Sequence, residues 1–368
     1  MQKSHTPYQG RLHSLDVLRG FDMFFIMGGD ALLLYLCCHF SGTWMDVVAP
    51  QLGHPAWHGF TAYDLIFPLF LFIAGVSFPF SFNKQLEHGQ SLSRIRLRIV
   101  RRGLTLVVLG MVYNGLLNLD FENIRVASVL GRIGLAWMLA ALTATWVGRK
   151  GRYVLMAATL LGYWALLTLC SAPDSDACNL SMEGNIVSYV DRLLLPGILH
   201  NGIHDPEGLL GTLPAMCTAL IGMEAGEAVR NGKGARTCLW LAAAGAGLIA
   251  LAWAWHYVFP INKNLWTSSF VCLTGGISLL LFSLFHYCID LRGWRKGTLF
   301  FSVIGLNSIT IYLAQQFIDF RFTARAIFGG AAGCLPEAWQ GVALAAGYVA
   351  VCWAFLYFLH RNRIYLKV

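Results

Sequence analysis

Long apolar stretches, separated by short polar connections, run along nearly the whole chain. An apolar stretch of about 18 residues or more is typical of a transmembrane helix. The pattern predicts an all-α integral membrane protein with about ten transmembrane helices in one bundle. The predicted helices cover residues 21–40, 62–82, 103–118, 127–147, 153–171, 208–229, 237–258, 266–288, 298–316 and 339–360.

The polar connections contain no long linker and no low-complexity segment, so a single domain over residues 1–368 is expected. Residues 1–20 form its predicted N-terminal segment and residues 361–368 its tail. The first twenty residues are polar and carry Asp16, so no cleavable signal peptide is predicted. No internal repeat is evident, which counts mildly against a secondary transporter, since many transporters are built from inverted repeats.

Composition supports the membrane prediction, because 57% of the residues are hydrophobic and only 12% are charged. Soluble domains carry about a quarter charged residues. The net charge of +8 reflects a bias in the loops, since all but six of the 27 basic residues lie on the predicted inner side. This positive-inside bias predicts cytoplasmic termini and explains the basic charge without a nucleic-acid partner. The six exceptions are Arg125, Arg132, Arg192, Lys263, Arg321 and Arg325.

Carboxylates lie in and beside the first predicted helix. Asp16 and Arg19 are three residues apart, so they share a helix face and can form an ion pair at the helix start. Asp22 and Asp30 lie within the apolar stretch, where a carboxylate is costly and suggests a function. A buried carboxyl satisfied by a neighbouring helix is an equally good interpretation of Asp30.

The densest chemical signal is the stretch HPAWHGFTAYDLIFP, residues 54–68, where an outer loop enters the second helix. His54 lies in the loop, and an imidazole is the usual general base near neutral pH. Asp64 falls in the first helical turn after Thr61, where a capping role is the alternative to a catalytic one.

The other outer loops are rich in acids, Trp and Asn, which suit a cationic or amino sugar. Outer loops also collect acids simply because basic residues stay inside. The candidates for substrate binding are Trp57, Asp191, Arg192, Asp205, Glu207, Asn262, Lys263, Asn264, Trp266 and Asn307.

Metal and disulfide chemistry find less support. His54 with His58, and His200 with His204, have the HxxxH spacing of a metal-binding helix, but the first pair precedes its helix and no Cys cluster accompanies either. No metal site is therefore expected. Most of the ten cysteines lie inside predicted helices. Cys170 and Cys178 flank a polar outer loop, and a disulfide between them is left open.

Several strings of unusual composition occur in order between residues 11 and 316: RLHSLDVLRG, HPAWHGFTAYDLIFPLFLFIAG, YVDRLLL, DPEGLLGTLPA, FPINKNLW and GLNSITIYL. Together they resemble the heparan-α-glucosaminide N-acetyltransferase family and its bacterial relatives, which are transmembrane acyltransferases. The resemblance implies an enzyme that takes acetyl from cytoplasmic acetyl-CoA and passes it to a glucosamine amine across the membrane. A bacterial relative of this kind is expected in the inner membrane.

The resemblance also implies site residues. The catalytic histidine of the family falls on His54 and the carboxylate of its motif on Asp64. Asp30 stands where the lysosomal enzyme has an asparagine. The chain has no counterpart of the large luminal N-terminal portion of that enzyme, so a free amino sugar or a cell-envelope fragment is the expected acceptor.

Physical reasoning adds the donor end. The phosphates of CoA are anionic, and Arg19, Arg101 and Arg102 lie at the inner face, with Arg132 near an end of the fourth helix. His54 can act as a general base or carry the acetyl group transiently, and the sequence leaves both routes open. A secondary transporter of sugars or amino sugars and a non-catalytic membrane subunit are the alternatives. Homodimer formation is also left open.

Overall fold

The computed structural model describes residues 12–40, 42, 45–232 and 234–366. Lys3, Arg11, Lys233 and Lys367, which belong to the predicted inner basic residues, lie outside these ranges. The described chain is helical and contains no strand, and two isolated bridges join Arg125 to Gly197 and Ser171 to Asn185. The α-helices are α1 His13–Phe24, α2 Asp30–His39, α3 Met45–Val48, α4 Ile66–Glu87, α5 Leu92–Tyr113, α6 Val129–Trp146, α7 Arg149–Leu169, α8 Ile186–Leu194, α9 Thr212–Asn231, α10 Ala235–His256, α11 Ser268–Phe285, α12 Thr298–Leu306, α13 Ser308–Phe317, α14 Phe320–Gly333 and α15 Glu337–Arg361.

Short helical segments of other types extend or connect these helices. The 3₁₀ segments are η2 Ala49–Leu52, η3 Ala62–Leu65 and η4 Leu116–Asn118, and the π-helical segments are η1 Phe25–Gly29 and η5 His286–Leu291.

The described residues include seven helical segments long and apolar enough to span a membrane, or up to eight if the bent pair α12 and α13 is one span. These seven coincide with seven of the ten predicted stretches. The stretches 103–118 and 208–229 belong to α5 and α9, whose 22 and 20 residues include charged side chains near their inner ends. An all-α membrane protein is therefore supported, whereas the remaining spans stay a prediction.

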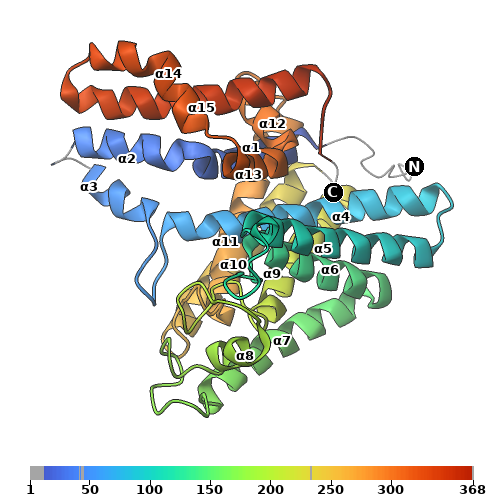
Figure 1. Cartoon of the computed structure of the whole chain (residues 1–368). Helices are drawn as coiled ribbons and strands as arrows, with labels where there is room; N and C mark the ends of the chain where they lie inside the picture. The colour runs from blue at the N-terminus through green and yellow to red at the C-terminus, as the bar shows by residue number, and fades with distance from the viewer. Residues whose placement is uncertain (1–11, 41, 43–44, 233, 367–368) are drawn as a thin grey trace, which may run out of the picture.

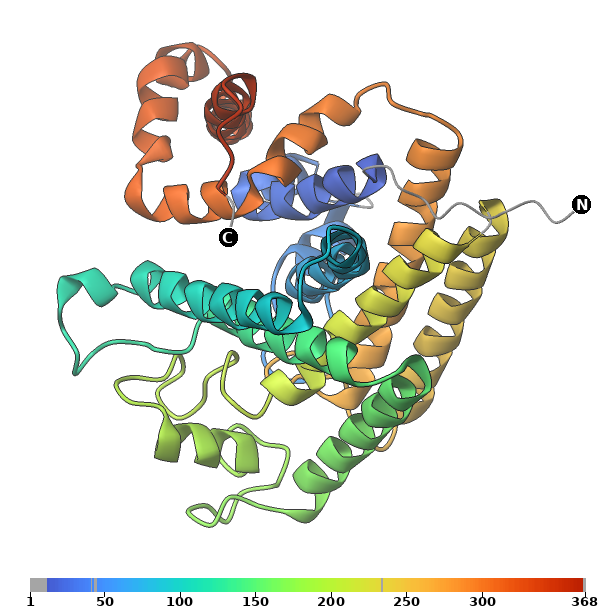
Figure 2. The same ribbon diagram turned by 90° about the vertical axis from the view of Figure 1, so that its right-hand side faces the viewer.

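The helices form two groups (Figure 1). The larger group contains α4–α7 and α9–α11, and the smaller group, along one side, contains α1, α2 and α12–α15. Figure 2 shows α14 and α15 at the corner of the molecule farthest from α7 and α8. Helix α4 packs against α1, α6, α9 and α11, so it joins the two groups.

Glycines bring the backbones of these central helices into contact. A Cβ atom at Gly222 of α9 would lie 2.1 Å from the Phe72 carbonyl oxygen of α4, and one at Gly75 would lie 2.2 Å from the Ala219 oxygen. Small residues that permit such close approach are the usual basis of helix packing in membranes. The same device joins α1 to α12, where a Cβ at Gly20 would lie 1.7 Å from the Phe301 oxygen.

Two interrupted helical segments lie next to one another in the bundle. The π-helical segment η1, with Gly28 at φ 109°, separates α1 from α2. A bend of 69° at Asn307 separates α12 from α13. Helix α13 contacts both α1 and η1. Irregular backbone inside a membrane is tolerated only where it is buried or lines a cavity, and both interruptions line the cavity described below.

Topology is directly testable. The positive-inside bias predicts that the α4–α5 connection faces the cytoplasm and that the loop after α7 faces out. We expect cysteines placed at His88 and at Ser171, with Cys170 and Cys178 replaced by serine, to label from opposite sides in sealed vesicles. Because Gly89 has a φ of 71°, its exposed neighbour His88 is the better position for a cysteine. Labelling of both positions from one side would contradict this topology.

Candidate active site

His54 and Asp64 form the centre of the candidate site. The Nδ1 atom of His54 lies 2.6 Å from Oδ1 of Asp64. The Asp64 side chain is fully buried, while the His54 side chain is 49% exposed. Thr61 fixes the carboxylate in a capping box, since its backbone N–H and its hydroxyl both donate to Oδ2 of Asp64. The capping role and the contact with His54 therefore use different oxygens of one carboxylate.

A lysine from a distant loop completes this centre. Nζ of Lys263 lies 3.2 Å and 3.1 Å from the two ring nitrogens of His54, and 3.4 Å from Oδ1 of Asp64. Nearly equal distances to both nitrogens mean that the Lys263 amine lies beside the ring, not in line with one nitrogen. Burial lowers the pKa of Lys263, although the nearby Asp64 and Glu207 oppose this shift.

The loop that carries Lys263 is built by its neighbours. Oδ1 of the buried Asn262 accepts a hydrogen bond from Leu265 N, and its Nδ2 lies 3.2 Å from Nδ1 of His58. Trp266 has a φ of 52° and is 1% exposed, with its ring packed against Phe67. No face of this ring is left for a sugar, so Trp266 packs the core in this structure.

The backbone also ties this loop to the histidine loop, because Gly59 N donates to the Ile261 carbonyl over 2.9 Å. Gly59 adopts a φ of 127°, a conformation that glycine reaches at little cost. Asn264, next to Lys263, is partly buried.

Asp30 reaches the site through a tyrosine. The hydroxyl of Tyr63 donates to Oδ2 of Asp30 over 3.1 Å, and the Tyr63 ring centre lies 5.0 Å from that of His54. Asp30 also accepts a hydrogen bond from Ala31 N at the start of α2. Asp30 therefore positions Tyr63 and forms no hydrogen bond with His54 itself.

A cavity of about 230 Å³ opens beside these residues, and we call it the histidine cavity. His54, Tyr63, Lys263 and Glu207 supply much of its polar lining, and both helix interruptions contribute to its wall. The remaining wall is largely apolar and includes Met23, Ile26, Ile66, Phe67, Phe70, Val129, Leu130, Ile133, Ile309 and Tyr312.

A second cavity, of about 250 Å³, lies farther along α4, and we call it the arginine cavity. Its lining includes Arg98, Arg102, Ser77, Ser81, Gln85 and Trp137. The guanidinium carbon of Arg102 lies 4.4 Å from the Trp137 ring centre, which is a cation–π arrangement. Arg19 donates to the Ser77 hydroxyl beside it over 3.2 Å.

One face of each of two helices serves both cavities. Along α4 and η3 the lining positions are 63, 66, 67 and 70 for the histidine cavity, then 74, 77, 78, 81 and 85 for the arginine cavity. Along α6 they are 129, 130 and 133, then 137. These intervals of three and four residues define a single helix face. The two cavities therefore follow one line through the bundle.

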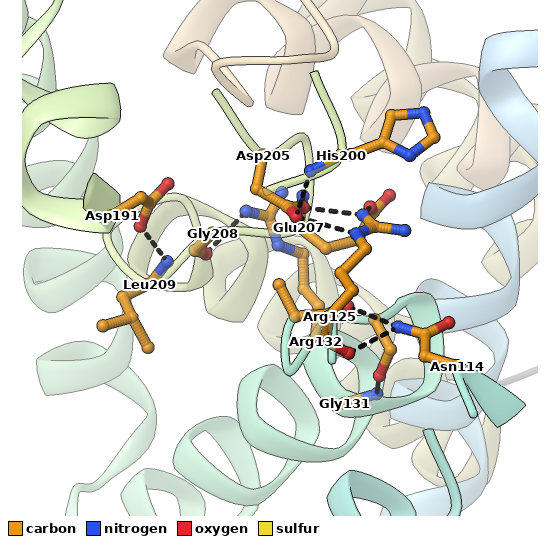
Figure 3. A network of polar contacts seen from close by, with 12 residues as sticks. Asn114, Arg125, Gly131, Arg132, Asp191, His200, Asp205, Glu207, Gly208 and Leu209 are labelled. Atoms are coloured by element: carbon orange, nitrogen blue, oxygen red, sulfur yellow. Dashed lines mark hydrogen bonds and ion pairs between the residues drawn. The ribbon is translucent and has the colours of Figure 1, made fainter. Parts of the chain in front are cut away.

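An ion-pair network holds the predicted outer loops beside the histidine cavity (Figure 3). Arg125 donates to both carboxylate oxygens of the buried Asp205, over 2.7 Å and 2.6 Å, and also pairs with Glu207. Burial alone would raise the pKa of Asp205, but hydrogen bonds from Arg125 hold it below its usual value. Asp205 also accepts from His200 N over 3.1 Å. Asp205 thus orients the loop, and Glu207 is the member that faces the cavity.

Arg132 and Asp191 secure the next residues of this loop. Arg132 is buried, donates to the Gly208 carbonyl over 2.7 Å and lies 5.3 Å from the Trp266 ring centre. Asp191 accepts from Leu209 N over 2.8 Å, and burial raises its pKa to about 6. A Cβ at Gly208 would lie 1.7 Å from Oδ2 of Asp191, so only glycine fits between the two side chains.

The other predicted residues lie around this network. Trp57 donates from Nε1 to the Leu180 carbonyl over 2.8 Å, and its ring packs near His204. Arg192 pairs with Asp174 at the outer surface. Asn307 is buried at the α12–α13 bend, next to Ser308 of the cavity wall. Of the predicted residues, the structure thus brings His54, Asp64, Lys263 and Glu207 together around one cavity.

Within the described ranges, no group of three or more His, Cys, Asp or Glu side chains is arranged to hold a metal ion. His204 accepts or donates a hydrogen bond at Ser188 over 2.7 Å, and burial lowers its pKa to about 4. Cys170 and Cys178 are both unbonded, exposed thiols.

Sequence reasoning assigned no role to Tyr63 or Arg125. Tyr63 stands next to Asp64 in the quoted motif, and Arg125 is one of the six basic residues outside the predicted inner segments. The sequence therefore contained a signal for each of these two residues. Nothing in the sequence distinguishes Arg98, which lines the arginine cavity, from Arg101, which does not.

Comparisons with known proteins identify relatives of this chain. The family model "Heparan-alpha-glucosaminide N-acetyltransferase, catalytic" matches residues 11–255, which include His54 and Asp64. The human heparan-alpha-glucosaminide N-acetyltransferase is 26% identical over 423 aligned residues, and the mouse protein of the same name is 25% identical over 422. Each alignment covers 97% of this chain but 60% of the relative, so the chain spans well under two thirds of these relatives' length.

Proposed function

This chain belongs to the heparan-alpha-glucosaminide N-acetyltransferase catalytic family, and from that premise we propose that it is a transmembrane N-acetyltransferase of amino sugars. It takes acetyl from cytoplasmic acetyl-CoA and transfers it to the amine of a glucosamine-type sugar on the outer side. The observation that carries this proposal is the shared helix face, which runs from the arginine cavity to His54. The protein acts in a bacterial inner membrane, with both termini in the cytoplasm.

Acetyl-CoA fits the two cavities with its phosphates in the arginine cavity and its thioester in the histidine cavity. Arg98 and Arg102 attract the CoA phosphates at the inner end, with Arg19 close by. Helix α4 rises only about 12 Å from Ala74 of the arginine cavity to Ile66 of the histidine cavity. The pantetheine arm therefore passes along the mainly apolar stretch of α4 between these two residues. The thioester then reaches His54 and Lys263, where the acceptor amine arrives from outside.

The residues around His54 define the proton path. Asp64 accepts the proton of Nδ1, which leaves Nε2 of His54 as the base. As the amine nitrogen attacks the thioester carbon, Nε2 takes a proton from that nitrogen. The C–N bond forms, the C–S bond breaks, and the CoA thiolate leaves and recovers a proton from the imidazolium. Lys263, which lies beside the ring, stabilises the negative charge that develops on the carbonyl oxygen.

A product assay tests this function. Purified protein is incubated with labelled acetyl-CoA and a panel of glucosamine, galactosamine and glucosaminyl disaccharides, and products are identified by mass. We expect an acetyl group on at least one amino sugar, at its nitrogen. Transport of amino sugars into proteoliposomes without any acetylated product would contradict the proposal.

The donor end makes a separate prediction. Replacing Arg102 with glutamine is expected to raise the KM for acetyl-CoA by about tenfold, because one charge-assisted contact with a phosphate is lost. The KM for the sugar should change little. Arg101→Gln is the matched control, since this adjacent arginine does not line the arginine cavity but carries the same charge at the inner face. Equal KM values in the two variants would mean that Arg102 serves only as a topological anchor.

A further inference from the structure

Two of the six basic residues outside the predicted inner segments have no role in the site described above. Arg125, Arg132, Arg192 and Lys263 each have a partner in the outer loops or at His54. Arg321 and Arg325 are exposed residues of α14, and neither forms a salt bridge with any carboxylate that the structure describes. Basic residues on this side of the membrane are scarce in the chain, so two of them on one helix need an explanation.

Both arginines line a third cavity, of about 370 Å³, which we call the α14 cavity. They are four residues apart, so their side chains project from one face of the helix. Gln315 and Tyr348 lie in the same wall, and Gln315 donates to the Tyr348 hydroxyl over 2.7 Å. Asp30 is the single carboxylate in the lining, and its oxygens already accept hydrogen bonds from Tyr63 and from Ala31 N. The cavity thus has an excess of positive charge.

The α14 cavity adjoins the histidine cavity. Ile26 of η1 lines both of them. Tyr63 lines the histidine cavity, where its ring lies beside His54, and donates through its hydroxyl to Asp30 in the wall of the α14 cavity. The α14 cavity and the histidine cavity are therefore neighbours that share part of one wall.

We propose that the α14 cavity binds an oxyanion, a phosphate or a carboxylate, that the acceptor sugar carries in addition to its reacting amine. This inference rests on the proposed function and specifies the class of acceptor. The planar guanidinium group of arginine matches such oxyanions and forms two parallel hydrogen bonds with them. A neutral amino sugar would make no use of two arginines. The phosphate of an anionic lipid has the same chemistry, but the wall shared with the histidine cavity favours a group attached to the acceptor.

Binding measurements test the cavity without any turnover. Glucosamine 6-phosphate and glucosamine are titrated by calorimetry into the full chain in a neutral detergent, without acetyl-CoA. We expect the phosphorylated sugar to bind the native protein at least about tenfold more tightly, as for a charge-assisted contact. The pair Arg321→Gln with Arg325→Gln should abolish this preference, and the pair Arg321→Lys with Arg325→Lys should keep much of it. Arg295→Gln with Lys296→Gln removes two exposed inner charges and should change nothing.

Kinetic and lipid arms separate the alternatives. If the native protein acetylates both sugars with equal kcat/KM, and the glutamine pair changes neither value, this inference is overturned while the proposed function stands. If no amino sugar is acetylated, the proposed function fails, whatever the calorimetry shows. A third outcome would assign the cavity to a lipid and overturn the inference. In that outcome, phosphatidylglycerol stabilises the native protein against heat more than phosphatidylcholine does in nanodiscs, and the glutamine pair loses this difference. The protein also shows no preference between the two sugars.

Discussion

Replacing His54 with alanine is expected to lower kcat by at least about a hundredfold, because a general base contributes typically 10²–10⁴-fold in rate. His54 is half exposed in a loop, so the change leaves no cavity in the core. Folding and acetyl-CoA binding should therefore be retained, which thermal unfolding and calorimetry can check. In the native protein, kcat/KM should rise with pH as the general base loses its proton. That rise should be missing from the residual activity of the variant.

His58→Ala is the matched control, because it removes an imidazole four residues away in the same loop. His58 contacts Asn262 and forms no hydrogen bond or ion pair with Asp64, so its loss should cost far less activity. A His54→Ala variant that keeps most of its activity would end the mechanism proposed here. A quenched reaction with labelled acetyl-CoA and no sugar distinguishes direct transfer from a route in which His54 carries the acetyl group. We expect no acetyl group on the peptide that carries His54, whereas a kinetically competent acetyl-enzyme would require an acyl-imidazole step.

Asp64→Asn is expected to lower kcat by at least about tenfold, with a smaller effect on KM. The carboxylate accepts the proton of His54 Nδ1 over 2.6 Å and so keeps Nε2 free as the base. An asparagine of the same shape can instead present its N–H₂ group, which favours the opposite tautomer of the imidazole. The hydrogen bonds from Thr61 to the other oxygen can still form, so the turn at the start of α4 should persist.

A double variant distinguishes an effect through His54 from a loss of folding. If Asp64 acts only by orienting His54, then His54→Ala with Asp64→Asn should be about as active as His54→Ala alone. Multiplicative losses would mean that Asp64 has a second task, such as holding Lys263 in place. A fall in the unfolding temperature that parallels the loss of activity would mean that Asp64 acts only as a helix cap.

The sequence predicted the all-α class and the family, and these are confirmed. Seven of the ten predicted stretches coincide with helical segments long and apolar enough to span a membrane. The apolar pattern was less informative for α5 and α9, because arginines and glutamates occupy their inner ends. It also missed α14, since its 14 residues include two arginines and fall short of a span. Apolar length identifies helices that can cross the lipid by themselves. Helices α5, α9 and α14 carry charged residues and depend on neighbouring helices, so the length of an apolar stretch predicts them less well.

At the candidate site, spacing placed His54 and Asp64 near one another, but it could not assign residues brought in from far away. Lys263 is 209 positions from His54, and no local pattern predicts their contact. Trp266 was predicted to contact the sugar because it belongs to a polar outer loop. Its left-handed backbone turns the ring inward, and a single sequence does not reveal such a turn. Arg132 was predicted at the donor end, yet its side chain points to Gly208.

The apolar wall of the histidine cavity has a consequence for the membrane as a permeability barrier. A site supplied with polar molecules from both sides is a weak point in the bilayer, through which protons and ions can leak. Phe67, Phe70, Leu130 and Ile133 line the part of the cavity nearest the arginine end. A narrow hydrophobic constriction tends to exclude water and so to block ions, and an apolar wall favours the same effect. In the mechanism proposed above, we expect these four side chains to limit ion leakage through the site.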